Sequence, residues 1–510
     1  MDISHTKFKK LKEKAIHDWA SAKRLPKNKD TLPMYTRAKS FINTTKHPVV
    51  QKRQEEFLTI LRKEVKRLLG TEVAESVVKQ LKLNHSFSTA QHFSSILHPW
   101  TLSASLQAAL PYFDQDSDAL KNIIVLSCAN ISFDNQWFPR GFIFHSVSPD
   151  GLVENRRAFF SRKVRPLPIT NHESYKEDAI AVIIGKLQGM RNENLLSAPV
   201  FDKIRYIVNA TFADPKVLSQ TVFTDQITMT SFVLWKKILE QTSENLNIPN
   251  LVFVEQENIV MQLLLAYHVH KPTVIHELLF NPEYHSLLEE YFEGIQGGFS
   301  QKNRLGTFLF WAMPKEQKYR TQLFRKRNML VTADESYKIS LTPDGIEKGI
   351  REKTLIPSTL LSLLLLSMYY GYILIGGMEQ ANYLTQAKQA FIKLLEKMKD
   401  LESIEAAKSV PTTNNVITRP MLTYIEGPQD ARVPASGLDM LLYAEKGSLN
   451  KIFDVSKKVT LGQLLDRVLP NIYKEHTPDE EKTEELMAIT ERQIEKLTGL
   501  DKLVPPLAKL

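Results

Sequence analysis

The sequence contains a single cysteine, Cys128, among its 510 residues. One thiol cannot form a disulfide within the chain, so the class of small secreted domains that disulfides stabilise is excluded. The first residues, MDISHTKFKKLKEK, also lack the apolar core that a secretory signal needs. These absences predict a protein of a reducing compartment, and we expect it in the cytoplasm.

Common motifs for phosphate, hydrolase or zinc chemistry are absent too. The sequence has no GxGxxG, no P-loop, no GxSxG and no kinase signature. It also lacks HExxH and paired-cysteine zinc spacings, so we predict no metal ligands among its site residues. The cofactor stays open, with a nucleotide or Mg²⁺ as candidates, because carboxylates such as Glu255 and Glu257 could hold a magnesium ion.

Charge is distributed unevenly along the chain. Residues 1–70 carry a net charge of +11, whereas the remaining 440 residues sum to −2. A nucleic-acid-binding face needs clustered lysines and arginines, so the main part of the chain is not expected to bind nucleic acid. Only the basic N-terminal segment could grip a polyanion, and the alternative is that its charges are the solvated faces of ordinary helices.

One uncharged stretch is long enough to cross a membrane. It comprises the 25 residues between Lys353 and Glu379. Pro357 and the pair Gly376 and Gly377 interrupt it, and no comparable segment exists elsewhere in the sequence. We therefore expect a buried helix followed by a short strand and no transmembrane span, with membrane association as the alternative.

The periodicity of apolar residues divides the chain into three parts. Residues 1–75 repeat apolar residues every three or four positions, as amphipathic helices do. Within residues 76–400, β-prone runs such as NIIVLSCANISF and NLVFV alternate with helical segments. This alternation predicts an α/β fold with a Rossmann-like, mainly parallel sheet core. Residues 401–510 are predicted to form a mostly helical C-terminal subdomain, whose helices could also join two copies of the chain.

Polar residues gather where predicted strands end, and α/β sheets bind ligands at such ends. STAQHFSSILHP places hydroxyls, an amide and imidazoles beside a helix start, whose first amides lack internal partners. In NISFDNQWFPRG, Arg140 could clamp a carboxylate or phosphate, or pair with Asp134. Glu255 and Glu257 follow the next strand and could bind an amine or accept a proton, or stabilise a helix start.

The segment LIGGMEQANYLTQAKQAF, residues 374–391, ends the uncharged stretch in a polar corner. Gly376 and Gly377 are expected to turn the chain sharply and bring the following polar residues to the mouth of a pocket. The predicted catalytic residues are Glu255, Glu379 and His92. The predicted substrate-binding residues are Ser88, Thr89, Gln91, His98, Asn135, Arg140, Gly376, Gly377, Gln380, Asn382 and Tyr383.

Residues 374–391 resemble the late motif of the bacillithiol-biosynthesis cysteine-adding enzymes, where a glycine pair leads through an acidic residue and a tyrosine to a helix ending in Lys and Phe. STAQHFSSILHPWTLSASLQAAL is similar in position to that family's early G-x-Q-A-G-x-x-x-G-P segment. Gln91 falls at its glutamine, but the glycines are missing. The resemblance implies a Rossmann-like core, a helical connecting subdomain, a C-terminal coiled coil, and ligase-like joining of an amino acid to an amine-bearing acceptor.

The sequence thus predicts a cytoplasmic enzyme of small-molecule biosynthesis, of ligase or transferase type, that joins an amino acid or similar small acid to an amine. The alternative is a non-catalytic binding protein whose basic N-terminal segment contacts nucleic acid, an acidic membrane or a protein partner. The enzyme hypothesis requires that the separate polar corners, each at the end of a buried strand, meet in space around one small molecule.

Overall fold

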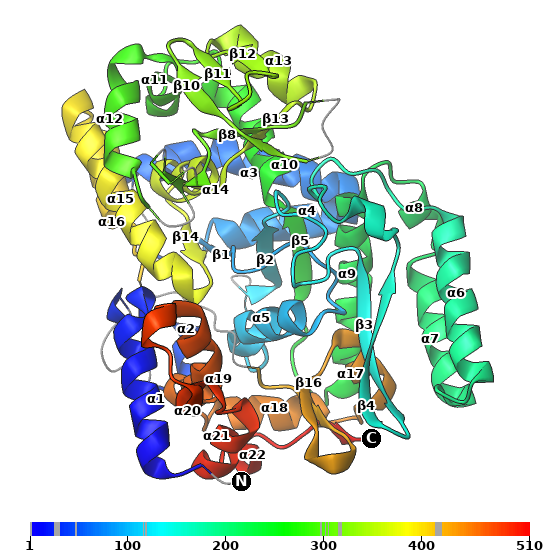
Figure 1. Cartoon of the computed structure of the whole chain (residues 1–510). Coiled ribbons are helices and arrows are strands. Elements are labelled where there is room, and N and C mark those ends of the chain that lie inside the picture. Colours follow the sequence, from blue (N-terminus) through cyan, green and yellow to red (C-terminus); the bar gives the residue numbers. More distant parts are fainter. Residues whose placement is uncertain are drawn as a thin grey trace.

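The computed structural model describes residues 3–24, 31–45, 48–115, 117, 120–295, 298–300, 302–303, 305–314, 319–413 and 421–510. Helices account for 55% of the structure and strands for 15%. The predicted mixed α/β class is therefore confirmed, with helices as its larger part (Figure 1).

A four-stranded parallel sheet lies at the centre of the molecule, in the order β14-β1-β2-β5 (Figure 1). Its strands are β1 (Ser86–Ser88), β2 (Asn122–Ser127), β5 (Asn250–Glu255) and β14 (Ile373–Ile375). The β2 and β5 strands pair over six residues, from Asn122 beside Asn250 to Ser127 beside Glu255. Every residue of β2 is buried, as the near-continuous apolar run predicts for a strand covered on both faces.

Alternate residues of the central strands enter two different hydrophobic clusters. Ile123 and Val125 of β2 belong to one cluster, which we call the α5 cluster. Ile124 and Leu126 belong to the other, the α3 cluster. Successive side chains of a strand point to opposite faces, so each cluster covers one face of the sheet.

The α5 cluster draws on helices from several regions of the chain. They include α5 (Pro99–Ala109), α6 (Glu177–Asn192), α7 (Ala198–Thr211), α9 (Phe223–Thr242), α17 (Gly437–Tyr443) and α18 (Ser448–Ser456). The α3 cluster includes α3 (Pro48–Leu69), α4 (Thr71–Leu81), α10 (Gln256–Leu263), α11 (Val274–Phe280), α12 (Pro282–Phe292), α13 (Pro343–Arg351), α15 (Met378–Met398) and α16 (Leu401–Ser409). Helices thus lie on both faces of the sheet.

Several strands outside the central sheet were not predicted from the sequence. The longest pair is an antiparallel hairpin of β3 (Gly141–Ser148) and β4 (Gly151–Ala158). A three-stranded sheet of β13 (Leu355–Pro357), β8 (Phe310–Ala312) and β9 (Thr321–Gln322) lies near α10 in Figure 1. Near the C-terminus, β15 (Tyr424–Glu426) pairs with β16 (Arg432–Pro434) and β17 (Ala508–Lys509).

The uncharged stretch that follows Lys353 is broken into short buried elements. After β13 come α14 (Thr359–Leu363), a π-helical segment η6 (Leu364–Tyr369) and the central strand β14. The predicted buried helix followed by a short strand is confirmed. Among the described residues, no helix combines the length and the apolar character that a membrane crossing requires.

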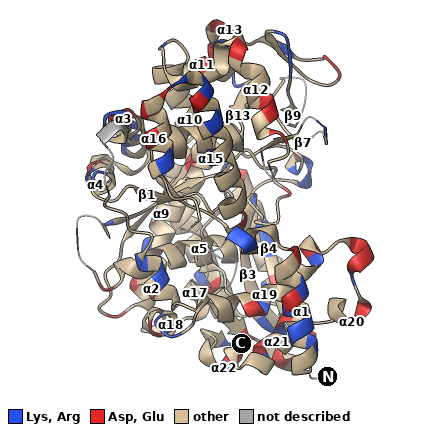
Figure 2. Ribbon diagram, turned by 90° about the vertical axis from the view of Figure 1, so that its left-hand side faces the viewer, with Lys and Arg blue, Asp and Glu red and all other residues tan. Residues whose placement is uncertain are grey.

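The N-terminal helix α1 (His5–Asp18) packs against helices close to the C-terminus (Figures 1 and 2). A third hydrophobic cluster joins residues of α1 and α15 to residues of α19 (Leu461–His476), α20 (Glu484–Met487) and α21 (Glu491–Thr498). Basic side chains of α1 meet acids there: Lys12 Nζ lies 2.6 Å from Asp466 Oδ1, and Lys7 Nζ lies 3.3 Å from Glu485 Oε1. Part of the N-terminal positive charge is therefore neutralised within the molecule.

Gly371 connects η6 to β14 in a conformation that favours glycine. Its φ is +70°, and an added Cβ would lie 2.1 Å from Val50 Cγ1. We expect Gly371→Ala to lower the free energy of unfolding by about 2–4 kcal/mol, with ~1 from the backbone and the rest from overpacking. Chemical denaturation measures this loss.

Gly151 supplies the matched control, since its φ is +119° but an added Cβ there meets nothing within 4 Å. Gly151→Ala should cost only the backbone part, about 1 kcal/mol. Adding Val50→Ala to Gly371→Ala makes room for the new methyl group and should recover part of the loss. Equal destabilisation by the two alanine substitutions would contradict the steric explanation.

Candidate active site

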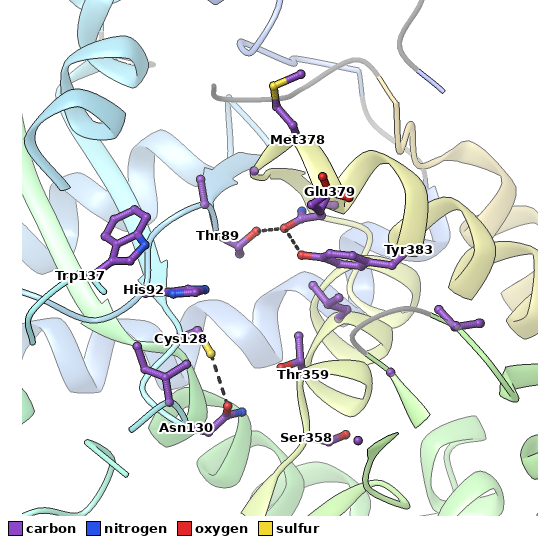
Figure 3. A pocket seen from close by; sticks show the side chains of 18 of the residues that line it. Thr89, His92, Cys128, Asn130, Trp137, Ser358, Thr359, Met378, Glu379 and Tyr383 are labelled. Atoms are coloured by element: carbon purple, nitrogen blue, oxygen red, sulfur yellow. Dashed lines mark hydrogen bonds between the residues drawn. The ribbon is translucent and has the colours of Figure 1, made fainter. Parts of the chain in front are cut away.

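A cavity of about 700 Å³ lies at the carboxyl ends of all four central strands (Figure 3). The residues after the strands that line it are Thr89 and Ala90 (β1), Cys128 and Asn130 (β2), Gln256 (β5), and Gly377, Met378, Glu379 and Gln380 (β14). Carboxyl ends of parallel strands share one edge of a sheet, which is why four distant loops meet here. The polar corners singled out in the sequence therefore converge.

Tryptophans form much of the apolar wall. Four of the five in the chain, Trp19, Trp100, Trp137 and Trp311, line the cavity. Trp137 meets Trp100 edge to face with ring centroids 5.6 Å apart, and it stacks on His98 at 5.9 Å. Rings packed in this way lose little freedom when a ligand binds, so the wall is preorganised for a planar or apolar group.

The glycine pair after β14 makes space and does not supply an unusual backbone conformation. Gly377 has an ordinary extended backbone with φ −68° and ψ 168°, and neither glycine has a positive φ. An added Cβ at Gly376 would lie 2.1 Å from Cδ of Gln380. The expected sharp turn is thus corrected: Gly376 lets the Gln380 side chain fold back over it.

Gln380 joins two hydroxyl groups at the cavity wall. Its Oε1 accepts hydrogen bonds from Thr89 Oγ1 at 3.0 Å and from Tyr383 Oη at 3.4 Å (Figure 3). Burial raises the pKa of Tyr383 above its ordinary value. The phenol therefore stays protonated and can act as a hydrogen-bond donor.

Cys128, which is half-buried, and Glu257, which is buried, form a pair beside the cavity. The Cys128 thiol donates to Glu257 Oε1 at 3.4 Å, and the amide of Ala129 donates to Glu257 Oε2 at 2.8 Å. Burial first, and the Glu257 carboxylate second, raise the pKa of Cys128. The group that faces the cavity is thus a neutral thiol and not a thiolate.

Glu255 points away from the cavity. Its carboxylate accepts hydrogen bonds from Thr224 Oγ1, at 2.7 Å, and from Thr170 Oγ1. Burial first, and the nearby Glu257 second, raise the pKa of Glu255 to about 8. Glu255 is therefore largely protonated at neutral pH, and its neighbour Gln256 lines the cavity in its place.

Glu379 links three parts of the chain at the cavity wall. Its two carboxylate oxygens accept hydrogen bonds from Trp19 Nε1 at 2.6 Å and Ser21 Oγ at 2.7 Å. His476 Nε2 of α19 lies 3.5 Å from Glu379 Oε1. The N-terminal segment and the C-terminal helices therefore close one side of the cavity through this carboxylate.

The predicted site residues divide into two groups. Those that line the cavity are Thr89, His92, Gly377, Glu379, Gln380 and Tyr383. Those that do not line it are Ser88, Gln91, His98, Asn135, Arg140, Glu255, Gly376 and Asn382.

Several members of the second group support the first. Ser88 Oγ donates to Gln91 Oε1 at 2.7 Å, and Asn135 Oδ1 lies 3.3 Å from His92 Nδ1. Burial lowers the pKa of His98 to about 3, and its neutral ring accepts from Trp100 N at the start of α5. These residues position the loops after β1 and β2.

Arg140 and Asn382 face other groups. The Arg140 guanidinium lies 5.4 Å from the centre of the Phe138 ring. Burial and the nearby Arg165, Arg162 and Arg156 lower the pKa of Arg140. Asn382 accepts a hydrogen bond from Gln386 at 3.3 Å, one turn along α15. Neither contact involves the cavity.

Other lining residues were missed in the sequence. Arg320, Trp311, Ser358, Thr359 and His476 come from segments remote from the predicted corners. They carry no local motif, because only the folded chain brings them to the strand ends. Asn130 and Trp137 belong to a loop that the sequence did single out, and the position of this loop after a buried strand was the available signal.

The described residues hold no group of three or more His, Cys, Asp or Glu side chains that could bind a metal ion. No protein-family model matches the chain, and no curated protein matches it. The resemblance of residues 374–391 to the bacillithiol-biosynthesis enzymes thus stays a prediction, and function is argued from the geometry of the cavity.

The protonated state of Glu255 makes the stability of the fold depend on pH. Its pKa in the folded state, about 8, lies above the ordinary value of 4.5, so the folded chain holds a proton that the unfolded chain releases. This contribution is complete below about pH 4.5 and is lost as the pH rises to 8, at about 1.4 kcal/mol per pH unit. We expect Glu255→Gln to reduce the fall in unfolding free energy between pH 5 and 8.

Denaturant unfolding at a series of pH values measures this slope. The control is Glu480→Gln, at an exposed position, which should follow the wild type. A Glu255→Gln curve parallel to that of the wild-type protein over the whole interval would show that Glu255 ionises normally.

Proposed function

We propose that this protein is a cytoplasmic small-molecule biosynthetic enzyme of ligase or transferase type. It joins an amino acid or a similar small acid to an amine-bearing acceptor. The observation that carries the proposal is the meeting of four strand ends around one cavity of about 700 Å³. That volume is typical of small-molecule sites, and apolar walls with a few placed polar groups are their usual lining.

The sheet order supports a Rossmann-like core as part of this proposal. The chain leaves β1 toward β2 and β5 and then returns to β14 on the other side of β1. Doubly wound sheets bind ligands at such a reversal of strand order, beyond the carboxyl ends. Thr89 and Gln380, which follow the two strands at the reversal, are joined by a hydrogen bond of 3.0 Å.

The described lining residues include both positive and negative side chains, which could bind an acid and an amine at different places in the cavity. Arg320 is the one Lys or Arg among the described lining residues, and Glu379 and Glu475 are the acids. In Figure 3, Glu379 lies at the opposite end of the site from Asn130, the hydrogen-bond partner of Arg320. We assign the acid substrate to the Arg320 side and the amine to the acidic side.

Within this proposal His92 is the base that accepts the proton lost by the amine. Its Nδ1 lies 3.3 Å from the side-chain oxygen of Asn135, which can only accept a hydrogen bond. This contact favours the tautomer of His92 that carries its proton on Nδ1 and its lone pair on Nε2. Thr89 and Tyr383 donate their hydroxyl protons to Gln380 Oε1 and so hold that side chain at the cavity wall.

Amide formation also expels an oxygen of the carboxylate, which requires an activating co-reactant. A nucleoside triphosphate is the candidate, and no residue is assigned to it.

The alternative is a non-catalytic protein that binds a polyanion through its basic N-terminal segment. It has less support, because Lys7, Lys12 and Lys14 are paired with Glu485, Asp466 and Glu481. Binding of this kind would weaken steeply with salt and would not depend on the cavity.

Gly377 offers a way to block the cavity without disturbing the backbone. An added Cβ there meets no atom within 4 Å, and the φ of −68° suits any residue. We expect Gly377→Phe to fill the space and to lower product formation by more than about tenfold, since a loss of 1.4 kcal/mol in binding has that effect. Gly377→Ser should retain activity, because serine caps a helix well and adds little volume.

The measurement is mass spectrometry of reactions that contain amino acids, small organic acids, amine metabolites and Mg-ATP. The expected product has the mass of an acid plus an amine minus water. If Gly377→Phe and the wild-type protein formed equal amounts of product, the cavity would not be the site of the reaction. Melting temperatures check that both variants are folded.

A further inference from the structure

Arg320 presents an unused edge to the cavity. It is half-buried, and its Nη1 donates to Asn130 Oδ1 at 2.8 Å and to the Asn130 carbonyl oxygen. Nε and Nη2 make no hydrogen bond with a described residue, and neither atom is sealed from solvent. These two nitrogens form the side of a guanidinium that binds a carboxylate through two parallel hydrogen bonds.

The guanidinium is held in place before any ligand arrives. Its Cζ lies 4.4 Å from the centre of the Trp311 ring, which also lines the cavity. Stacking on one face and two hydrogen bonds from Nη1 fix the plane of the group. A fixed donor loses little conformational entropy on binding, so its free edge is suited to a specific ligand.

No acid in the described part of the chain occupies this edge. Among the described residues, no carboxylate oxygen lies within 4.0 Å of an Arg320 nitrogen. Glu257 is the carboxyl group that interacts electrostatically with Arg320. Its two oxygens already accept hydrogen bonds from Ala129 N and the Cys128 thiol. A half-buried cation without a paired carboxylate is costly, and an anionic ligand would offset that cost.

The surroundings favour an anion of one charge. Arg320 is the one cation of Lys or Arg type among the described lining residues, and the Glu257 carboxyl lies close enough to act on it. A dianionic phosphate would therefore meet less positive charge than it carries. A carboxylate matches the single fork in both charge and shape.

We propose that Arg320 binds the carboxylate of the acid substrate side-on through Nε and Nη2, with Asn130 and Trp311 as positioning residues. This assignment rests on the proposed function and adds the substrate class: a small organic monocarboxylate. The tryptophan-lined wall then receives the apolar or planar remainder of that acid.

Paired probes test the carboxylate directly in the wild-type protein. We choose 4-hydroxyphenylacetate, its amide and phenyl phosphate, together with a panel of amino acids and their amides, and measure binding by calorimetry. The acids should bind at least about tenfold more tightly than their amides, as expected for a charge-assisted pair of hydrogen bonds. Tighter binding of phenyl phosphate than of the acids would overturn the carboxylate assignment in favour of a phosphate.

Substitution at Arg320 tests the residue. Arg320→Gln should lower the affinity for the acids by about tenfold or more and leave the amides unchanged. Arg320→Lys keeps the charge but loses the fork, so its affinity should fall between the two. Arg327→Gln is the matched control, because Arg327 is exposed, does not line the cavity and lies on a turn between two short strands.

Two outcomes separate this inference from the proposed function. Product formation without any preference of acid over amide, or an unchanged affinity in Arg320→Gln, would overturn the role of Arg320 and leave the enzyme proposal standing. A clear preference for acids that depends on Arg320, without product formation, would support the role of Arg320 and count against the enzyme proposal. If no acid in the panel binds more tightly than its amide, the inference is wrong.

Discussion

The pairing of β1 with both β2 and β14 is the constraint on which the site depends. Three residues of β1 lie beside three of β14, from Ser86 beside Ile373 to Ser88 beside Ile375. This register sets Thr89 next to Gln380, so that the two side chains can meet at 3.0 Å. A shift of one residue would move the strands by about 3.3 Å and separate that pair. The short strand β14 thus aligns the glycine corner with the rest of the cavity.

The two ends of the chain complete the enclosure. Trp19, Met378 and Ile472 belong to the hydrophobic cluster of the terminal helices, and all three also line the cavity. Ion pairs between α1 and the C-terminal acids reinforce this packing, although exposed pairs contribute little each. The basic N-terminal segment therefore serves as a structural part of the wall, which its charge alone did not reveal.

Much of the fold follows from apolar patterns. The runs NIIVLS and NLVFVE became β2 and β5, because residues that are apolar on both faces can be buried only inside a covered sheet. The hairpin of β3 and β4 was missed although Asp150 and Gly151 mark its turn, since β4 mixes charged and apolar residues.

The site was predictable to the level of loops and not of side chains. Glu255 and Gln256 are neighbours, but Glu255 ends β5 beside two threonines and only Gln256 reaches the cavity. Orientation at a strand end depends on the face on which the last residue falls, and a one-residue difference reverses it. Arg320 was beyond reach, because its position beside Asn130 depends on folding across 190 residues.

The distribution of tryptophan has an optical consequence. Trp235 is fully buried and donates a hydrogen bond to the Pro249 carbonyl oxygen, so its fluorescence should not change when a ligand enters the cavity. The other four indoles share the wall of one cavity, and two of them lie 5.6 Å apart, close enough to exchange excitation energy. A molecule that displaces water from this wall would change the environment of all four at once. The protein thus carries its own fluorescent reporter of occupancy, with an internal reference in the core.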